Sequence, residues 1–136
     1  MNEIDKLAQK ILEHHPAAQA IYLYGSYGTA YERTESDIDI AVLLAPQEAK
    51  AAGLLALSDL QFELEQLLKR DVDLVNLRQV PTVLQKEVIA ANRRIYQADV
   101  YAADEFEMLT LSYYQKLNEE RAEIIADAIA TGRLIA

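Results

Sequence analysis

The spacing of hydrophobic and polar residues predicts helices and strands in alternation along this chain. Near the N-terminus, apolar residues recur at helical spacing over 4–12, and Pro16 closes that segment. Runs of β-branched and aromatic residues bounded by glycine or charged residues are typical of strands. Such runs occupy 20–24, 37–44 and 71–77, and 93–97 is consistent with a short edge strand.

Longer amphipathic stretches predict three further helices. The first covers 46–70 and the second 81–92, and each starts at a proline. The third covers 99–131, and Gly132 lies where a helix terminator is expected. The buried stripe expected of the first is Leu57, Leu60, Leu64, Leu67 and Leu68, and that of the third is Phe106, Leu109, Tyr113, Leu117, Ile124 and Ala128.

The absence of repeats, low-complexity tracts and linkers predicts one α/β domain over residues 1–136, with a core at about 4–97. Its 136 residues include 13 basic and 22 acidic ones, a formal charge of −9. This balance argues against direct nucleic-acid binding, which needs clustered Lys and Arg. There is no cysteine, which excludes disulfides and thiolate metal sites, and no apolar run of the ~20 residues that a membrane helix needs. We therefore expect a cytoplasmic protein without membrane contact.

Asp37 and Asp39 stand at the mouth of a predicted buried strand. Because side chains two apart on a strand share a face, both project together, with Cα atoms roughly 6.5–7 Å apart. Charges at a buried edge are costly unless they are paired. Carboxylates at this spacing can share two cations, and all-oxygen ligation suits Mg²⁺ or Mn²⁺. Taken alone, the pattern is more typical of solvated strand-edge charges.

Two further features favour a functional pair. The strand at 71–77 repeats the pattern, and if it lies beside 37–44, Asp73 could join the first two aspartates. Asp71 fits a solvated charge instead. Gly25-Ser26 directly follows the strand at 20–24, where a glycine lets the backbone approach a phosphate and a helical turn would present free N–H groups.

Gly25-Ser26, ten intervening residues and Asp37-x-Asp39 together closely resemble the signature of the DNA polymerase β-like nucleotidyltransferase superfamily. The segment "VDLV" at 72–75 is similar to the strand that carries the third carboxylate of that family. The resemblance covers roughly residues 4–97. It implies the family's fold, a small mixed β-sheet flanked by helices, here with a long C-terminal helix.

The resemblance also implies an activity: transfer of a nucleoside monophosphate from a triphosphate to an acceptor hydroxyl, with release of pyrophosphate. Asp37 and Asp39 would bind two Mg²⁺ ions, with Mn²⁺ as a possible substitute. Asp73 would complete the ligands of one ion and could accept the proton of the acceptor.

The loop after the first strand would bind the triphosphate. Its backbone from Gly25 to Gly28, together with Ser26, would cradle the β- and γ-phosphates. Arg33, the only cation in the loop, could reach a phosphate or be a solvated loop charge. Many members of the family that this chain resembles have Ala-Arg-Gly after the Gly-Ser, whereas residues 28–31 here read "GTAY", so the phosphate contact of that arginine is missing unless Arg33 substitutes.

The segment "GSYGTAYERTESDIDIAVLL" at 25–44, the strand "DVDLV" at 71–75 and the C-terminal helix resemble those of the minimal nucleotidyltransferase (MNT) group, the MntA-like antitoxins of HEPN/MNT toxin–antitoxin systems, and the length of the chain fits that group. The resemblance implies transfer of AMP from ATP to a tyrosine of a HEPN-domain RNase toxin, with which the chain would form a hetero-oligomer. Two other functions stay open: a nucleotidyltransferase for an antibiotic or sugar, and a non-catalytic antitoxin that acts by binding alone. The helix at 99–131 either packs on its own sheet or docks the partner.

Overall fold

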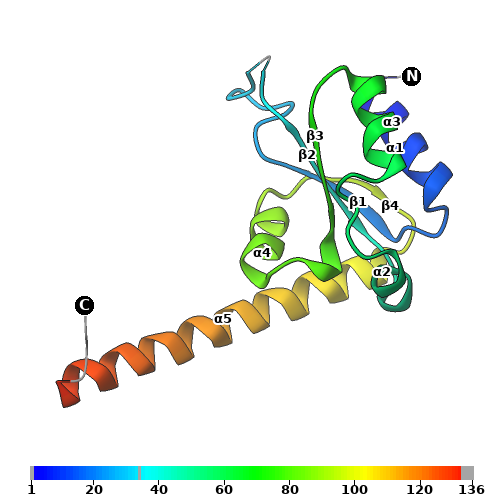
Figure 1. Ribbon diagram of the computed structural model, residues 1–136. Helices are drawn as coiled ribbons and strands as arrows, with labels where there is room; N and C mark the ends of the chain where they lie inside the picture. Colours follow the sequence, from blue (N-terminus) through cyan, green and yellow to red (C-terminus); the bar gives the residue numbers. More distant parts are fainter. Residues whose placement is uncertain (1, 34, 133–136) are drawn as a thin grey trace.

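In a computed structural model that describes residues 2–33 and 35–132, the chain forms one four-stranded sheet with helices on both faces (Figure 1). Residues 1, 34 and 133–136 of the predicted domain lie outside the described residues. The elements are α1 (Glu3–His14), β1 (Ala20–Tyr24), β2 (Ile38–Leu43), α2 (Pro46–Ala52), α3 (Asp59–Leu68), β3 (Val72–Asn76), the 3₁₀ turn η1 (Leu77–Gln79), α4 (Thr82–Ala90), β4 (Arg94–Gln97) and α5 (Val100–Thr131).

The sheet is mixed, as the resemblance implies, with the strand order β3-β2-β1-β4. The central strand β2 pairs parallel to β3 and antiparallel to β1, and β4 pairs antiparallel to β1. The parallel pair requires a crossover, which α2 and α3 provide. Because β2 and β3 run parallel, they start at the same edge of the sheet, and β1 ends there.

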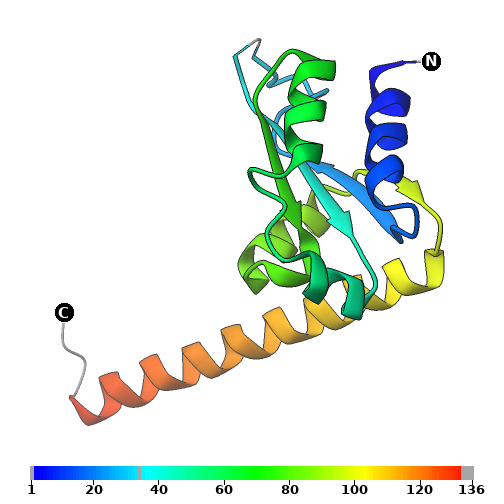
Figure 2. The ribbon, with the colours of Figure 1, turned by 45° about the vertical axis from the view of Figure 1, so that its right-hand side comes forward.

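Both faces of the sheet are buried by helices. Figures 1 and 2 show α1 and α3 side by side on one face and α4 and α5 on the other. The first layer includes Leu7, Ile11, Leu23, Ile40, Leu60 and Leu64, and the second Tyr22, Ala41, Leu43, Val88 and Phe106. Since side chains alternate along β2, Asp39 has the parity of Ala41 and Leu43 and lies on the α4–α5 face.

The single helix predicted over 46–70 is wrong, because the chain forms α2 and α3 with a break between them. Gly53 ends α2, and the Ser58 hydroxyl caps α3 by accepting the N–H of Gln61 at 3.3 Å. Leu57, predicted to be buried, falls in the break and is 82% exposed, and Leu67 is also exposed. Leu60, Leu64 and Leu68 of the predicted stripe are buried.

The long C-terminal helix has the predicted bounds, but most of it leaves the body of the protein (Figure 1). The Asp99 carboxylate caps it by accepting the N–H of Ala102 at 3.0 Å. Of its residues only Ala103, Phe106 and Thr110 are buried. Leu109, Tyr113 and Ile124 of the predicted stripe are exposed, so packing on its own sheet accounts only for the first part of α5. Neither α5 nor any other helix within 2–33 and 35–132 is long and apolar enough to span a membrane.

Candidate active site

Two predicted carboxylates lie side by side on adjacent strands. Asp39 of β2 and Asp73 of β3 are partners in the parallel register, and Tyr24 of β1 faces Asp39 from the other side. The three residues therefore form a row across the sheet on its α4–α5 face. Asp37 precedes β2 by one residue and is exposed, and Asp39 is half-buried. The strand at 71–77 thus lies beside 37–44, which was the condition for Asp73 to join the first two aspartates.

The end of β1 packs directly against Asp39. Gly25 has φ +73°, and a Cβ atom built on it would lie 2.1 Å from Oδ2 of Asp39. Any side chain at position 25 would displace that carboxylate. The left-handed backbone alone also costs an L-residue roughly 1–2 kcal/mol. Two independent constraints thus require glycine at the head of the loop.

The Asp39 carboxyl is electrostatically strained. Burial raises its pKa to about 6, with further contributions from the negative charges of Asp73 and Asp37. Within 2–33 and 35–132, no three acidic or histidine side chains already stand at metal-ligand spacing. The donors are nonetheless all carboxylate oxygens that repel one another, and a cation between them would offset that repulsion. The predicted aspartates therefore fit a divalent metal such as Mg²⁺.

The Tyr24 hydroxyl belongs to the same site and is not singled out by the sequence. Its oxygen is buried without a hydrogen-bond partner among the described residues. Burial raises the pKa of the phenol well above its usual value, and the charges of Asp73, Asp39 and Glu87 add to that effect. The hydroxyl is therefore a neutral donor close to the carboxylate row. An aromatic residue in a buried strand is typical of a hydrophobic core, so the sequence pattern gave no indication that Tyr24 belongs to the site.

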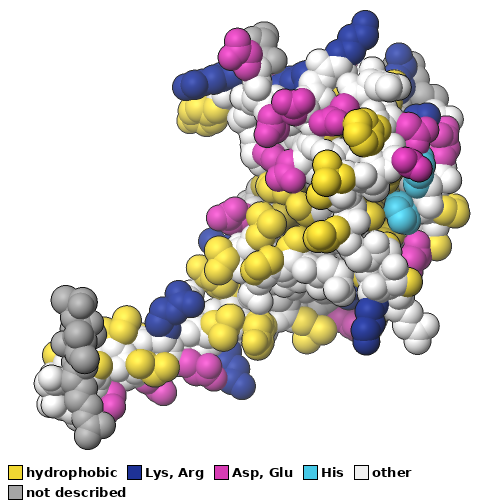
Figure 3. Space-filling model, in the orientation of Figure 1, with side chains coloured by type: hydrophobic (Ala, Val, Ile, Leu, Met, Phe, Trp, Pro, Cys, Tyr) yellow, Lys and Arg dark blue, Asp and Glu magenta, His cyan; other side chains and the backbone are white. Residues whose placement is uncertain are grey.

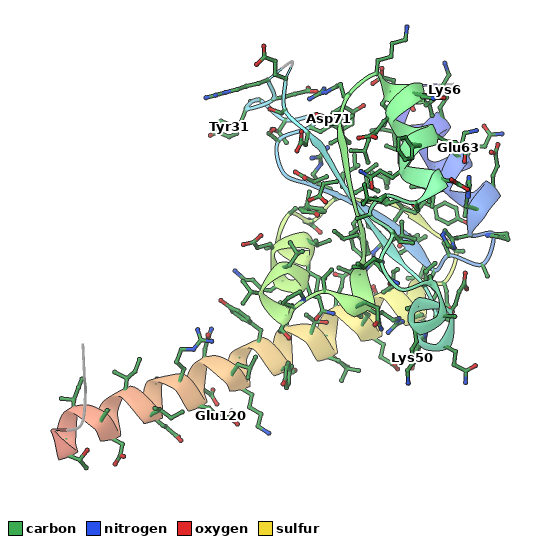
Figure 4. All side chains as sticks on the ribbon, viewed as in Figure 1. Lys6, Tyr31, Lys50, Glu63, Asp71 and Glu120 are labelled. Atoms are coloured by element: carbon green, nitrogen blue, oxygen red, sulfur yellow. The ribbon has the colours of Figure 1, made fainter. Side chains whose placement is uncertain are left out.

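The loop 25–36 is built from turns, so the helical turn considered for it does not form in its described part. The Ser26 carbonyl accepts two hydrogen bonds from Thr29, one from its backbone N–H at 3.0 Å and one from the Thr29 hydroxyl at 2.6 Å. Buried Tyr27 packs beneath the loop, and its hydroxyl donates to Glu3 at 2.7 Å. Tyr31, at the outer edge in Figure 4, is 85% exposed.

Arg70, at the end of the crossover, holds the far part of the loop in place. Its guanidinium donates to the carbonyls of Arg33 and Ser36 at 3.0 and 2.7 Å and pairs with Glu32 at 2.6 Å. The hydrogen bond from Arg70 to Glu32 is the main reason that the pKa of the Glu32 carboxyl lies below its usual value. The predicted phosphate ligand Arg33 has an exposed side chain, with no ion pair among the described residues.

Arg93, which the sequence pattern placed at the start of an edge strand, lies directly before β4 and reaches the loop. A Cβ atom on Gly28 would lie 2.8 Å from its Nη2. The structure thus places Gly25 against Asp39, which lies beside Asp73, and Gly28 against Arg93. The contact between residues 28 and 93 depends on the pairing of β1 with β4, which leaves no local pattern in the sequence.

Comparison with known proteins agrees with this geometry. Residues 6–101 match the family model described as "Polymerase beta, Nucleotidyltransferase". The chain is 38% identical over 133 residues to the protein adenylyltransferase MntA of Shewanella oneidensis, an alignment that covers 96% of this chain and 89% of the relative.

Solved structures show the same fold at similar identity. A toxin–antitoxin structure with AMP-PNP contains a chain 36% identical to this one, with a TM-score of 0.73, covering 95% of this chain and 99% of that chain. A structure of tri-AMPylated Shewanella oneidensis HEPN toxin in complex with MNT antitoxin contains a chain that is 35% identical, with a TM-score of 0.69. That match covers 93% of this chain and 96% of the other.

Proposed function

The chain belongs to the polymerase beta nucleotidyltransferase family and is a nucleotidyltransferase, and we propose that it transfers AMP from ATP to a tyrosine hydroxyl of a HEPN-domain toxin. We further propose that this modification neutralises the toxin, so that the chain acts as an antitoxin. Similarity over nearly the whole length to the adenylyltransferase MntA supports the reaction, and the AMPylated toxin in a similar complex supports the acceptor.

The observation that carries the proposal is the contact of Gly25 with Asp39, beside Asp73. It joins the turn assigned to the phosphates to the carboxylates assigned to the metal. In the proposal Asp37, Asp39 and Asp73 hold Mg²⁺, for which Mn²⁺ can substitute. The bound cation supplies positive charge to the triphosphate and lowers the pKa of the acceptor hydroxyl.

The residues of the chain align the reactants for a single displacement. The acceptor oxygen attacks the α-phosphorus of ATP, the bond from that phosphorus to the bridging oxygen breaks, and pyrophosphate leaves. We assign to Asp73, exposed on the edge strand, the acceptance of the hydroxyl proton. Backbone N–H groups from Gly25 to Gly28 and the Ser26 hydroxyl bind the β- and γ-phosphates.

The shape of the molecule fits an acceptor that is itself a folded protein. Figure 3 shows a broad hollow between the loop 25–36 and α5, with acidic side chains on the body and hydrophobic ones along the helix. The distal part of α5 exposes Ile124, Ile125 and Ile129. An isolated helix has little stability of its own in water, so this apolar surface supports docking of the toxin on α5.

The test uses α-labelled ATP, Mg²⁺, the purified chain and its HEPN partner, with proteins and small molecules separated after reaction. We expect label on the partner, lost with Asp37→Asn/Asp39→Asn and retained with Asp71→Asn, whose carboxylate is exposed and precedes β3. Label on an antibiotic or sugar would overturn the protein acceptor. A partner that is silenced without any label would overturn the enzymatic antitoxin and leave one that acts by binding.

A further inference from the structure

The Arg93 side chain fits against the backbone of the loop at Gly28. Gly28 has φ +76°, and its nearest neighbours for an added Cβ are Nη2 of Arg93 at 2.8 Å and Cζ at 3.9 Å. A side chain at position 28 would occupy the space that the guanidinium fills. The main chain anchors this arrangement, because the Arg93 carbonyl accepts the N–H of Leu23 at 3.0 Å, two residues before Gly25.

The Arg93 guanidinium has hydrogen-bonding capacity that nothing in the described protein uses. Its Nη1 is buried and has no acceptor among residues 2–33 and 35–132. The adjacent Arg94 shows the contrast, since it pairs with Asp104 at 3.0 Å and with Glu107. A buried donor on a charged group is costly when it is left unpaired. This cost points to an anionic ligand that completes the site.

The other arginines near the loop, Arg70 and Arg33, differ from Arg93 in their contacts. Arg70 is occupied by two backbone carbonyls and by Glu32. Arg33 is exposed and makes no ion pair among the described residues. Backbone donors do remain, since the N–H groups of Ser26 and Tyr27 reach no protein acceptor in the described part of the chain.

We propose that Arg93, the residue directly before β4, binds the β- and γ-phosphates of the nucleotide. This inference rests on the proposed function of the site. A guanidinium can bind two phosphate oxygens at once, and charge-assisted contacts of this kind are among the stronger hydrogen bonds. Both phosphates leave together as pyrophosphate, so Arg93 also stabilises the charge that develops on the leaving group.

Binding of AMP-PNP and of AMP, each with Mg²⁺, tests this assignment. We expect Arg93→Gln to weaken AMP-PNP binding about 10–100-fold and AMP binding less than threefold, with Arg93→Lys in between. Lys50→Gln removes the same charge from α2, distant from the loop in Figure 4, and should leave both affinities unchanged. Thermal unfolding of each variant confirms that it is folded.

A double-mutant cycle with Gly28→Ala separates a phosphate contact from a loss of loop structure. The added methyl group displaces Arg93, so Gly28→Ala should weaken AMP-PNP binding in the wild-type background and much less in Arg93→Gln. Equal AMP-PNP affinity of wild type and Arg93→Gln would overturn the role of Arg93 alone. A wild-type chain that binds neither nucleotide would overturn the proposed function together with it.

Discussion

At the scale of single residues, Asp39 is a proposed metal ligand whose charge destabilises the fold. Its pKa of about 6 lies above the ordinary value of about 3.8, because the carboxylate is partly buried beside two others. The native state therefore loses stability as the pH rises from about 4 to 6 and carries the full penalty above that range. A bound metal ion would remove this penalty, and the free energy recovered would strengthen metal binding.

Replacing Asp39 by Asn should stabilise the protein while abolishing AMP transfer. We expect a gain in the free energy of unfolding of about 1–2 kcal/mol at pH 8 without Mg²⁺, discounted for the partial exposure of the group. The gain should shrink towards pH 4, where Asp39 is protonated in both states. Urea unfolding at the two pH values measures it. Asp71→Asn is the control, and a gain that did not depend on pH would contradict the electrostatic explanation.

Gly25 and Gly53 allow steric contact to be separated from backbone strain. Both have positive φ, but an added Cβ meets Asp39 at position 25 and nothing within 4 Å at position 53. We expect Gly25→Ala and Gly53→Ala each to cost about 1 kcal/mol or more in stability from backbone strain. Only Gly25→Ala should also reduce AMP transfer, by about 100-fold or more, because Asp39 must move.

Initial rates at saturating ATP, with folding checked by circular dichroism, measure this difference. A similar loss of activity in both glycine variants would contradict a specific contact at Gly25. The argument also shows what sequence reasoning can reach at this scale. Gly25, Asp39 and Asp73 could be predicted because each lies at the end of a recognisable strand. Tyr24 and Arg93 could not, because their unpaired atoms arise only when distant strands meet.

At the scale of secondary structure, periodicity located every strand to within about one residue but merged α2 with α3. Leucines at helical spacing continue through the break, and the residues that end one helix and start the next, Gly53 and Ser58, are common inside longer apolar patterns. The capping residues therefore set the ends of α2 and α3, although the hydrophobic periodicity continues between them. For α5, periodicity gave the correct length, but it cannot distinguish a face that packs internally from one that awaits a partner.

The distal part of α5 should be needed for the partner and dispensable for the fold. Ile124 and Ile129 are 69% and 62% exposed, so their replacement by Gln should change the stability of the isolated chain by less than about 0.5 kcal/mol. If α5 docks the toxin, the double substitution should weaken the complex about 10-fold or more. Isothermal titration with the HEPN partner measures the affinity.

A matched control for these substitutions is Leu54→Gln, which removes an apolar side chain that is 86% exposed in the α2–α3 break. Its effect on the complex should be small. Equal weakening by Leu54→Gln would show that exposed apolar area in general drives association. Unchanged affinity in the Ile124→Gln/Ile129→Gln variant would place the toxin elsewhere on the molecule.

At the scale of the whole molecule, the chain is acidic and has a broad hollow between the loop 25–36 and α5 (Figure 3). A formal charge of −9 would repel a free nucleotide except where cations gather, which makes Arg93 and the metal more important. The same charge attracts a basic protein over a distance of about one Debye length. Substrate and partner are therefore expected to respond differently to salt.

The association rate with a basic HEPN toxin should fall about 10-fold or more when the salt concentration rises from about 50 to about 500 mM. The dissociation rate should change much less, because in the proposed complex the exposed isoleucines of α5 would make apolar contacts that salt does not screen. Stopped-flow mixing or surface plasmon resonance separates the two rates. If salt instead acted mainly on dissociation, the interface itself would consist largely of ion pairs, and the hydrophobic face of α5 would lie outside it.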